Sequence, residues 1–198
     1  MTVYTYLYES PELGDFSECV EIWKDSWARH GWDPVVTDRS FFVPSEDTFY
    51  LTFHVLSLPS VNHYLYELAC YQRWLTLPTT GGLMTDFDVI NRGFRPEHLD
   101  TRHDLLFLHP GIVPCAVYVA PQSVPALRDM MWDYKPHEHI LVNGKPHCSD
   151  QEMFRLPRNQ EKITIQPEVA EFGQPGWSSS RLVHFSNTSL LTQGFTQN

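Results

Sequence analysis

The alternation of apolar and polar positions predicts that the chain begins with a strand, a helix and a second strand. Residues 2–8 are β-branched and aromatic, which is typical of a strand. Apolar residues then recur at helical spacing over 15–30, and Gly31 ends the run. Residues 33–42 give a short second strand. A strand, a helix and a strand in this order indicate a parallel sheet.

The rest of the chain continues to mix helices and strands. Residues 47–57 are apolar throughout and fit either a helix or a strand. Elsewhere, periodicity, caps and breakers predict helices, and short apolar runs predict strands. The predicted helices are 61–77, 122–134 with Ser123 as its cap, and 150–156, and the predicted strands are 83–86, 104–110, 114–120, 161–167 and 180–186. No repeat or linker interrupts them, so we expect one domain over 1–198, with a polar, frayed end from residue 186.

Composition and charge limit the class of protein. The 198 residues are enough for one domain with a core, and most of the aromatic residues, 14% of the chain, are expected in that core rather than in a carbohydrate site. The net charge of −10 argues against nucleic acid and anionic membrane surfaces, because both need clustered lysine and arginine. No apolar run is as long as a membrane span, so no membrane insertion is expected.

Cysteine usage points to a reducing compartment. The four cysteines, at positions 19, 70, 115 and 148, form no C-x-x-C pair and no disulfide framework. The first ten residues enter strand-like sequence directly, without the pattern of a signal peptide. We therefore expect a cytoplasmic location.

Two aspartates follow the predicted strand 83–86, in the stretch LPTTGGLMTDFDV. Ligands of open α/β sheets bind beyond the carboxyl ends of the strands, which is where Asp86 and Asp88 fall. Both carboxylates can reach one hard divalent cation. Mg²⁺ or Mn²⁺ held in this way keeps its other positions for water and diphosphate oxygens. Phe87 is expected to face the core, and a plain turn after the strand is the alternative.

The spacing around these aspartates resembles the sugar-binding D-x-D region of GT-A fold glycosyltransferases. In those families a helix carries an arginine, a Gly-Gly pair follows eight residues on, and D-x-D comes four residues past the second glycine. Here Arg73, the glycines at 81–82, Asp86 and Asp88 stand at those spacings. The likeness is sharpest over residues 61–94.

The resemblance implies an α/β fold of the GT-A (Rossmann-like) type, a mixed, mainly parallel sheet flanked by helices. Residues 1–94 would bind the nucleotide sugar and residues 95–198 would form the acceptor side. The implied activity moves a sugar from a nucleotide diphosphate donor, by family habit a UDP-sugar, to a hydroxyl of a glycan or another acceptor, with Mn²⁺ or Mg²⁺ as cofactor. A non-catalytic nucleotide-sugar or glycan-binding module and a nucleotide-sugar hydrolase are the alternatives.

Two downstream stretches extend the resemblance. CSDQEMF looks like the Asp-Gln motif near the acceptor side of retaining enzymes of this fold. Asp150 and Gln151 are therefore candidate catalytic residues and retention is favoured, with a helix cap formed by Ser149 or Asp150 as the alternative. RLVHFS resembles the late strand whose histidine completes the metal site. That makes His184 the third ligand beside Asp86 and Asp88, where a hydrogen-bonded core histidine is the alternative.

Further residues are expected to bind the donor. Arg73 is expected to reach the sugar or phosphate with its planar fork, or else to form a salt bridge that only orients the aspartates. Asp86 is counted as a donor contact as well as a metal ligand. Tyr6, Tyr8 and Asp38 lie at or near the ends of the first two strands, where the base and ribose rest in such folds. Strand packing or a turn is the alternative for these three.

The sequence departs from the family pattern in two places. Many such enzymes have an aspartate three residues before the helix arginine, and this chain has Cys70 there. No lysine or arginine follows Arg181, so the neutralisation of phosphate is expected to rest on the metal and Arg73.

A rival metal site can be drawn in the stretch KPHEHILVNGKPHCSD. Its zinc ligands would be His137, His139, His147 and Cys148. The spacing matches no familiar zinc site, and Gly144 and Pro146 predict a loop or hairpin there. The histidines are alternatively expected to contact an acceptor sugar.

Overall fold

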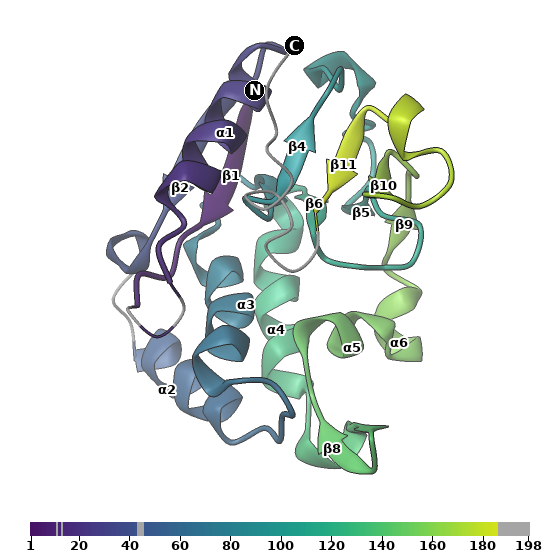
Figure 1. Cartoon of the computed structure of the whole chain (residues 1–198). Coiled ribbons are helices and arrows are strands. Elements are labelled where there is room, and N and C mark those ends of the chain that lie inside the picture. Colours follow the sequence, from purple (N-terminus) through teal and green to yellow (C-terminus); the bar gives the residue numbers. More distant parts are fainter. Residues whose placement is uncertain (11, 13, 43–45, 186–198) are drawn as a thin grey trace.

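The computed structural model describes residues 1–10, 12, 14–42 and 46–185 (Figure 1). In this part of the chain the main sheet has six strands, in the order β2-β1-β3-β6-β5-β9. Three of its pairings are parallel and two are antiparallel, which confirms the mixed, mainly parallel sheet. The strands are β1 (Thr2–Tyr6), β2 (Asp33–Thr37), β3 (Gly82–Thr85), β5 (Leu105–Phe107), β6 (Ala116–Val119) and β9 (Thr164–Ile165).

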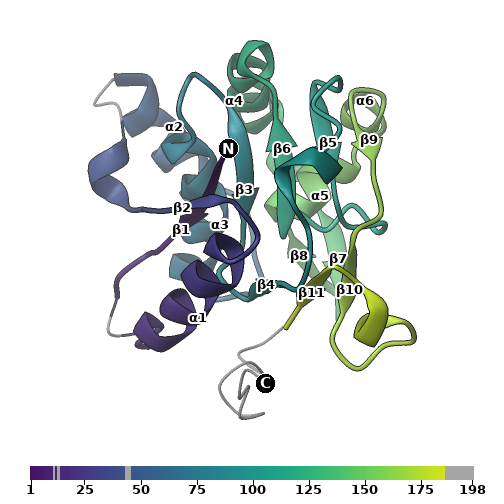
Figure 2. The same cartoon turned by 90° about the horizontal axis from the view of Figure 1, so that it is seen from above.

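Helices cover both faces of this sheet (Figure 2). They are α1 (Ser17–Ala28), α2 (Glu46–Leu56), α3 (Tyr64–Thr76), α4 (Val124–Asp133), α5 (Asp150–Arg155) and α6 (Pro157–Gln160). The ambiguous stretch 47–57 thus belongs to a helix. Across the described residues, no helix has the length and apolar character that a membrane span requires.

The core is divided by the sheet into two layers. Successive side chains of a strand point to opposite faces. Met84 therefore packs in the layer of α3 and α4 with Trp74, whereas Leu83 packs in the layer of α1 with Trp23 and Trp27. These three tryptophans are fully buried, as expected for core residues.

The tryptophans of α1 also hold the D-x-D turn in place. The indole N–H of Trp23 donates to Thr85 Oγ1 at 2.9 Å, and that of Trp27 donates to the Val89 carbonyl at 3.0 Å. Thr85 and Val89 flank the two aspartates on either side. Phe87, between the aspartates, is partly buried with its ring 5.0 Å from that of Phe16.

The Gly-Gly pair before β3 is required by close approach of other chain segments. Gly81 has a φ of +67°, and a Cβ there would lie 2.3 Å from the Val119 carbonyl oxygen. A Cβ on Gly82, with a φ of +147°, would lie 2.6 Å from the Tyr4 ring. A side chain at position 81 would meet the backbone at the end of β6, one at position 82 would displace the Tyr4 ring, and both φ values are ones that residues other than glycine rarely adopt.

A second, three-stranded sheet places His184 beside Asp86 and Asp88. It has the order β10-β11-β4, formed by β10 (Val169–Glu171), β11 (Leu182–His184) and β4 (Val89–Asn91). His184 pairs with Val89 in its register, and the Phe185 N–H donates to the Asp88 carbonyl at 3.0 Å. The sequence pattern predicted β11 but missed β4 and β10, which are three residues each.

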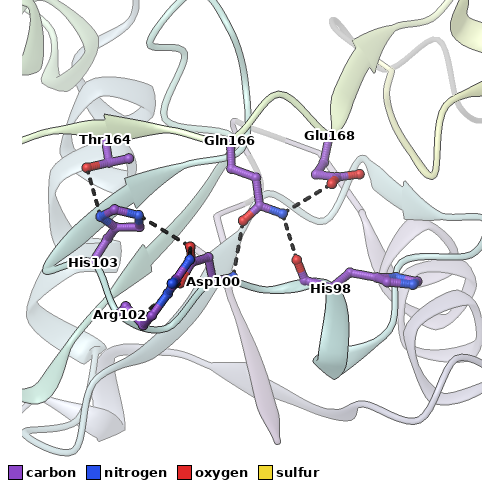
Figure 3. Close-up of polar contacts among 7 residues, drawn as sticks. All are labelled: His98, Asp100, Arg102, His103, Thr164, Gln166 and Glu168. Carbon is purple, nitrogen blue, oxygen red and sulfur yellow. Dashed lines mark hydrogen bonds and ion pairs between the residues drawn. The ribbon is translucent and has the colours of Figure 1, made fainter.

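A polar cluster at the far edge of the main sheet fixes β9 (Figure 3). The Gln166 side chain donates to the His98 carbonyl at 2.7 Å and accepts from the Asp100 N–H at 3.1 Å. Thr164 contacts His103 at 3.3 Å, and His103 in turn lies 3.4 Å from Asp100. These contacts compensate for the shortness of the edge strand, which has two residues where seven were predicted.

Three other local predictions have different outcomes. Ser123 occupies the N-cap position of α4, but its side chain makes no capping hydrogen bond. The segment 137–148 forms a hairpin, as predicted, from β7 (Ile140–Val142) and β8 (Lys145–His147). The end from residue 186, predicted to fray, lies outside the described residues.

Candidate metal and donor site

A cleft of about 620 Å³ opens beyond the carboxyl ends of β1 and β3, beside α3 and the start of α5. This is the position that the sheet topology predicts for a ligand. Eight of the nine residues proposed from the sequence line it, namely Tyr6, Tyr8, Arg73, Asp86, Asp88, Asp150, Gln151 and His184. The remaining residue, Asp38, does not.

Two carboxylates and an imidazole converge at one end of the cleft. Asp86, Asp88 and His184 each offer a ligand atom, and these atoms lie within 4.8 Å of one another. Asp88 Oδ1 is buried without a hydrogen-bond partner among the described residues, 3.4 Å from His184 Nε2. An orphaned carboxylate oxygen beside a second carboxylate and an imidazole fits a divalent cation, and these ligand types suit Mn²⁺ or Mg²⁺.

The carboxylate of Glu171 orients His184. Glu171 Oε1 lies 2.9 Å from His184 Nδ1, across the β10-β11 pairing, and 3.2 Å from His109 Nε2. A carboxylate on Nδ1 fixes the ring so that Nε2 faces the aspartates, which is the usual outer support of a metal-bound histidine. Sequence reasoning missed Glu171 and His109, because β10 was not predicted and nothing in the local pattern marks either residue.

The metal-free site holds a proton on His184. Burial alone would lower the pKa of His184, but its contacts with Asp88 and Glu171 outweigh burial and raise the pKa to about 10. The imidazole must lose that proton before Nε2 can bind a cation.

Mn²⁺ affinity should therefore rise with pH. From about pH 6 to about pH 8 the metal-free histidine stays protonated, so each bound ion releases one proton and the affinity increases roughly tenfold per pH unit. Titration of Mn²⁺ by calorimetry in buffers of different ionisation heat measures both the affinity and the proton release. The slope should flatten in His184→Ala. An affinity that does not change with pH in the parent protein would contradict this assignment.

Arg73 joins the metal end of the cleft to the opposite wall. Its side chain is 8% exposed, and its two terminal nitrogens pair with Asp86 Oδ1 and, at 2.5 Å, with Asp150 Oδ2. The guanidinium also lies over the Trp74 ring, 4.7 Å from its centroid. The salt bridge that the sequence offered as an alternative is present, with Asp150 rather than Asp88 as the second partner. Contact between Arg73 and a donor remains a prediction.

The helix cap at the start of α5 belongs to Ser149 rather than Asp150. Ser149 Oγ accepts from the Glu152 N–H at 3.3 Å. Asp150 is 3% exposed and accepts from the Trp74 indole at 3.0 Å in addition to Arg73. The capping alternative for Asp150 is therefore wrong, and its carboxylate belongs to the cleft wall.

The three residues proposed to contact the base and ribose, Tyr6, Tyr8 and Asp38, have different surroundings. The Tyr6 hydroxyl lines the cleft and donates to Gln72 Oε1 at 3.0 Å. The Tyr8 ring lies under the Arg39 guanidinium, 4.4 Å from the ring centroid. Asp38 accepts from Ser40 and begins a 3₁₀ turn, the role that the sequence offered as its alternative. Its contact with a ribose stays a prediction.

The structure does not support the rival zinc site. Among the described residues, the one group of ligands close enough to hold a metal is the Asp-Asp-His cluster. His139 Nδ1 bonds the Pro136 carbonyl at 2.9 Å, and His147 Nδ1 lies 3.1 Å from Ser60. Of the three histidines in that stretch, His147 lines the cleft.

Comparison with known proteins identifies the fold. No protein-family model matches the chain, and no curated protein matches its sequence. A structure of a glycosyltransferase involved in the glycosylation of the major capsid of PBCV-1 matches with a TM-score of 0.55 and 12% identity, over 97% of this chain and 95% of that chain. The glycosyltransferase GlyE of Streptococcus pneumoniae TIGR4 matches with a TM-score of 0.56 and 12% identity, over 94% of this chain.

The match to GlyE covers 55% of that protein, and 54% in its apo form, so the chain spans about half the length of GlyE. At 12% identity these likenesses establish the fold. The chain has the mixed α/β fold of these solved glycosyltransferases, with its cleft at the strand ends.

Proposed function

We propose that the chain is a metal-dependent glycosyltransferase of the GT-A type that moves a sugar from a UDP-sugar donor to a hydroxyl of a glycan acceptor. The observation that carries the proposal is the convergence of Asp86, Asp88 and His184 within 4.8 Å beside the strand ends. The fold shared with solved glycosyltransferases supports it. The D-x-D spacing and the Gly-Gly turn agree with it.

The charges of the cleft favour a donor that is bound through a metal. Asp86, Asp88 and His184 would hold Mn²⁺ or Mg²⁺, which would supply Lewis-acid stabilisation of a diphosphate leaving group. Among the described residues that line the cleft, Arg73 is the one lysine or arginine, and Asp86 and Asp150 already pair with it. The chain itself therefore supplies little free positive charge for a diphosphate.

Asp150 and Gln151 are proposed to act on the reacting sugar, with retention of its configuration. Positive charge develops at the anomeric carbon as the diphosphate leaves, and a carboxylate or amide oxygen at that face stabilises it. Both residues line the cleft, on the wall that Arg73 connects to Asp86.

Gln151→Ala should lower turnover tenfold or more, about 1.4 kcal/mol in the activation free energy, and leave UDP·Mn²⁺ affinity within roughly twofold. The reason is that its interaction strengthens only as charge develops, so the loss is confined to the transition state. Asp150→Asn should lower turnover as well, and because it also removes a charged partner of the buried Arg73, urea unfolding measures the accompanying loss of stability. Steady-state rates and calorimetry measure the two effects. Gln174→Ala, an exposed glutamine outside the cleft, is the matched control, and full turnover in Gln151→Ala would rule out the role.

Release of UDP from a panel of UDP-sugars, with and without glycan acceptors, tests the proposed function. A transferase releases UDP faster when the right acceptor is present, and the sugar appears on the acceptor. A hydrolase would release UDP at its full rate without acceptor, and a binding module would bind UDP-sugar and release none. Either of these two results would overturn the proposal.

A further inference from the structure

Glu67 is a buried carboxyl group in the cleft wall with one oxygen left without a partner. The residue is 6% exposed, and burial raises the pKa of its carboxyl group to about 7. Oε1 accepts from Asn62 Nδ2 at 2.6 Å and lies 3.1 Å from the Ser60 hydroxyl. Oε2 is buried and has no hydrogen-bond partner among the described residues. Buried polar atoms almost always have a partner, so this oxygen lacks a donor that a ligand can supply.

The carboxyl group is anchored in this position through Oε1. The loop before α3 is fixed to the end of β8 by the Cys148 N–H, which donates to the Pro59 carbonyl at 2.7 Å. The Ser60 hydroxyl lies 3.1 Å from His147 Nδ1 as well as from Glu67. Because two segments of the chain hold Oε1, the carboxyl group has a fixed place in the cleft wall, as a specific binding contact needs.

Glu67 lies at a distance from the metal end that suits a sugar. It is six residues before Arg73 on α3, which is about 9 Å along the helix axis. Glu67, Asn62 and His147 all line the cleft, together with Tyr66. A cleft wall with hydrogen-bonding groups and an aromatic ring is suited to a sugar ring, which has hydroxyls on its edge and an apolar face.

We infer that a sugar ring bound in the cleft turns the Glu67 carboxyl group about its Oε1 contacts, so that Oε2 accepts a hydrogen bond from a ring hydroxyl and determines which sugar is accepted. This inference rests on the proposed function. A UDP-sugar and a glycan acceptor both carry hydroxyls as their main hydrogen-bond donors near the reacting carbon. We do not expect a second metal ion to be the partner of this oxygen, because the described part of the chain has no further cluster of metal ligands beside Glu67.

Binding of three probes to Glu67→Gln and Glu67→Asp tests the inference. The probes are UDP with Mn²⁺, a panel of UDP-glucose, UDP-galactose and UDP-N-acetylglucosamine with Mn²⁺, and a panel of methyl pyranosides followed by saturation-transfer NMR. Glutamine keeps the contacts of Oε1 and puts an N–H donor in place of Oε2. Aspartate withdraws the carboxylate by one methylene group. Glu161→Gln, an exposed glutamate outside the cleft, is the matched control.

UDP·Mn²⁺ should bind every variant with the affinity of the parent, because the metal end does not include Glu67. If the hydroxyl belongs to the donor, the extra affinity of the preferred UDP-sugar over UDP should fall tenfold or more in both variants. If it belongs to the acceptor, the pyranoside signals should be lost instead. Unchanged binding of both panels would overturn the inference, as would failure of both variants to fold.

The readouts separate this inference from the proposed function. A parent protein that does not bind UDP·Mn²⁺ contradicts the proposed donor, whereas the pyranoside signals still decide the role of Glu67.

Discussion

Arg73→Ala should lower the free energy of unfolding by about 3 kcal/mol or more. Arg73 is buried and pairs with both Asp86 and Asp150. Its removal leaves two carboxylates near each other in a partly buried site without a compensating charge, and breaking one side of a buried ion pair typically costs about 3–5 kcal/mol. Urea unfolding in EDTA measures the change. Arg102→Ala, at a surface arginine that is 85% exposed, is the matched control and should cost little.

Mn²⁺ should restore part of the stability that Arg73→Ala loses, because a cation at the Asp-Asp-His cluster compensates the charge of Asp86. Arg73→Lys should recover less than the full stability, since one ammonium group cannot pair with two carboxylates as the planar guanidinium does. If Arg73→Ala unfolds at the same urea concentration as the parent, Arg73 does not organise the site.

Asp88→Ala should abolish Mn²⁺-dependent binding of UDP and leave the fold intact. One of the Asp88 oxygens is buried without a hydrogen-bond partner among the described residues, and Glu171 stays beside His184 when Asp88 is removed, so the fold should survive the loss of the Asp88–His184 contact. Mn²⁺ affinity should fall by more than the about ten- to hundredfold that loss of an outer supporting residue costs. His184→Ala should weaken it less, because a neutral ligand is removed and no charge is lost.

Calorimetry measures the loss of Mn²⁺ and UDP binding, and urea unfolding in EDTA measures the stability of the metal-free fold. Asp129→Ala, at an exposed aspartate of α4, is the matched control and should change neither quantity. If Asp88→Ala is unfolded in EDTA, Asp88 is a structural residue of the turn rather than a ligand.

The sequence predicted the parts of the site that lie in strong local patterns. The Gly-Gly pair is required by the approach of Val119 and Tyr4, and the aspartates follow directly at the strand end. The spacing of the arginine, the glycines and the aspartates, all within one stretch of about thirty residues, therefore predicted where the cleft lies. Arg73 was placed correctly on the facing helix because its position relative to Gly81 is fixed by the length of α3 and the turn.

Other parts of the site depend on contacts between distant segments, which local patterns do not encode. Glu171 reaches His184 only through the register of β10 and β11, two strands of three residues each. Asp150 meets Arg73 across 77 residues of sequence. The Asp-Gln motif predicted a cleft position for Asp150 but could not show which partner holds its carboxylate, so a helix cap remained the alternative. Ser149 makes that cap.

The edges of the fold were predicted least well for a similar reason. Strand β9 has two residues and depends on the side chain of Gln166 rather than on a long apolar run. The helix α6 begins at Pro157, directly after α5, and was not recognised as a separate element. Short elements of this kind gain their stability from tertiary contacts, and their sequences carry little periodic signal.

A thermal-unfolding series with UDP, in Mn²⁺ and in EDTA, tests the central claim most directly. The claim is that Asp86, Asp88 and His184 hold a divalent cation that binds the diphosphate of the donor. UDP at about a hundred times its dissociation constant should stabilise the protein by about 2.7 kcal/mol when Mn²⁺ is present. In EDTA the same UDP concentration should shift the melting temperature little. Equal shifts in Mn²⁺ and in EDTA, or no shift in either, would contradict the account.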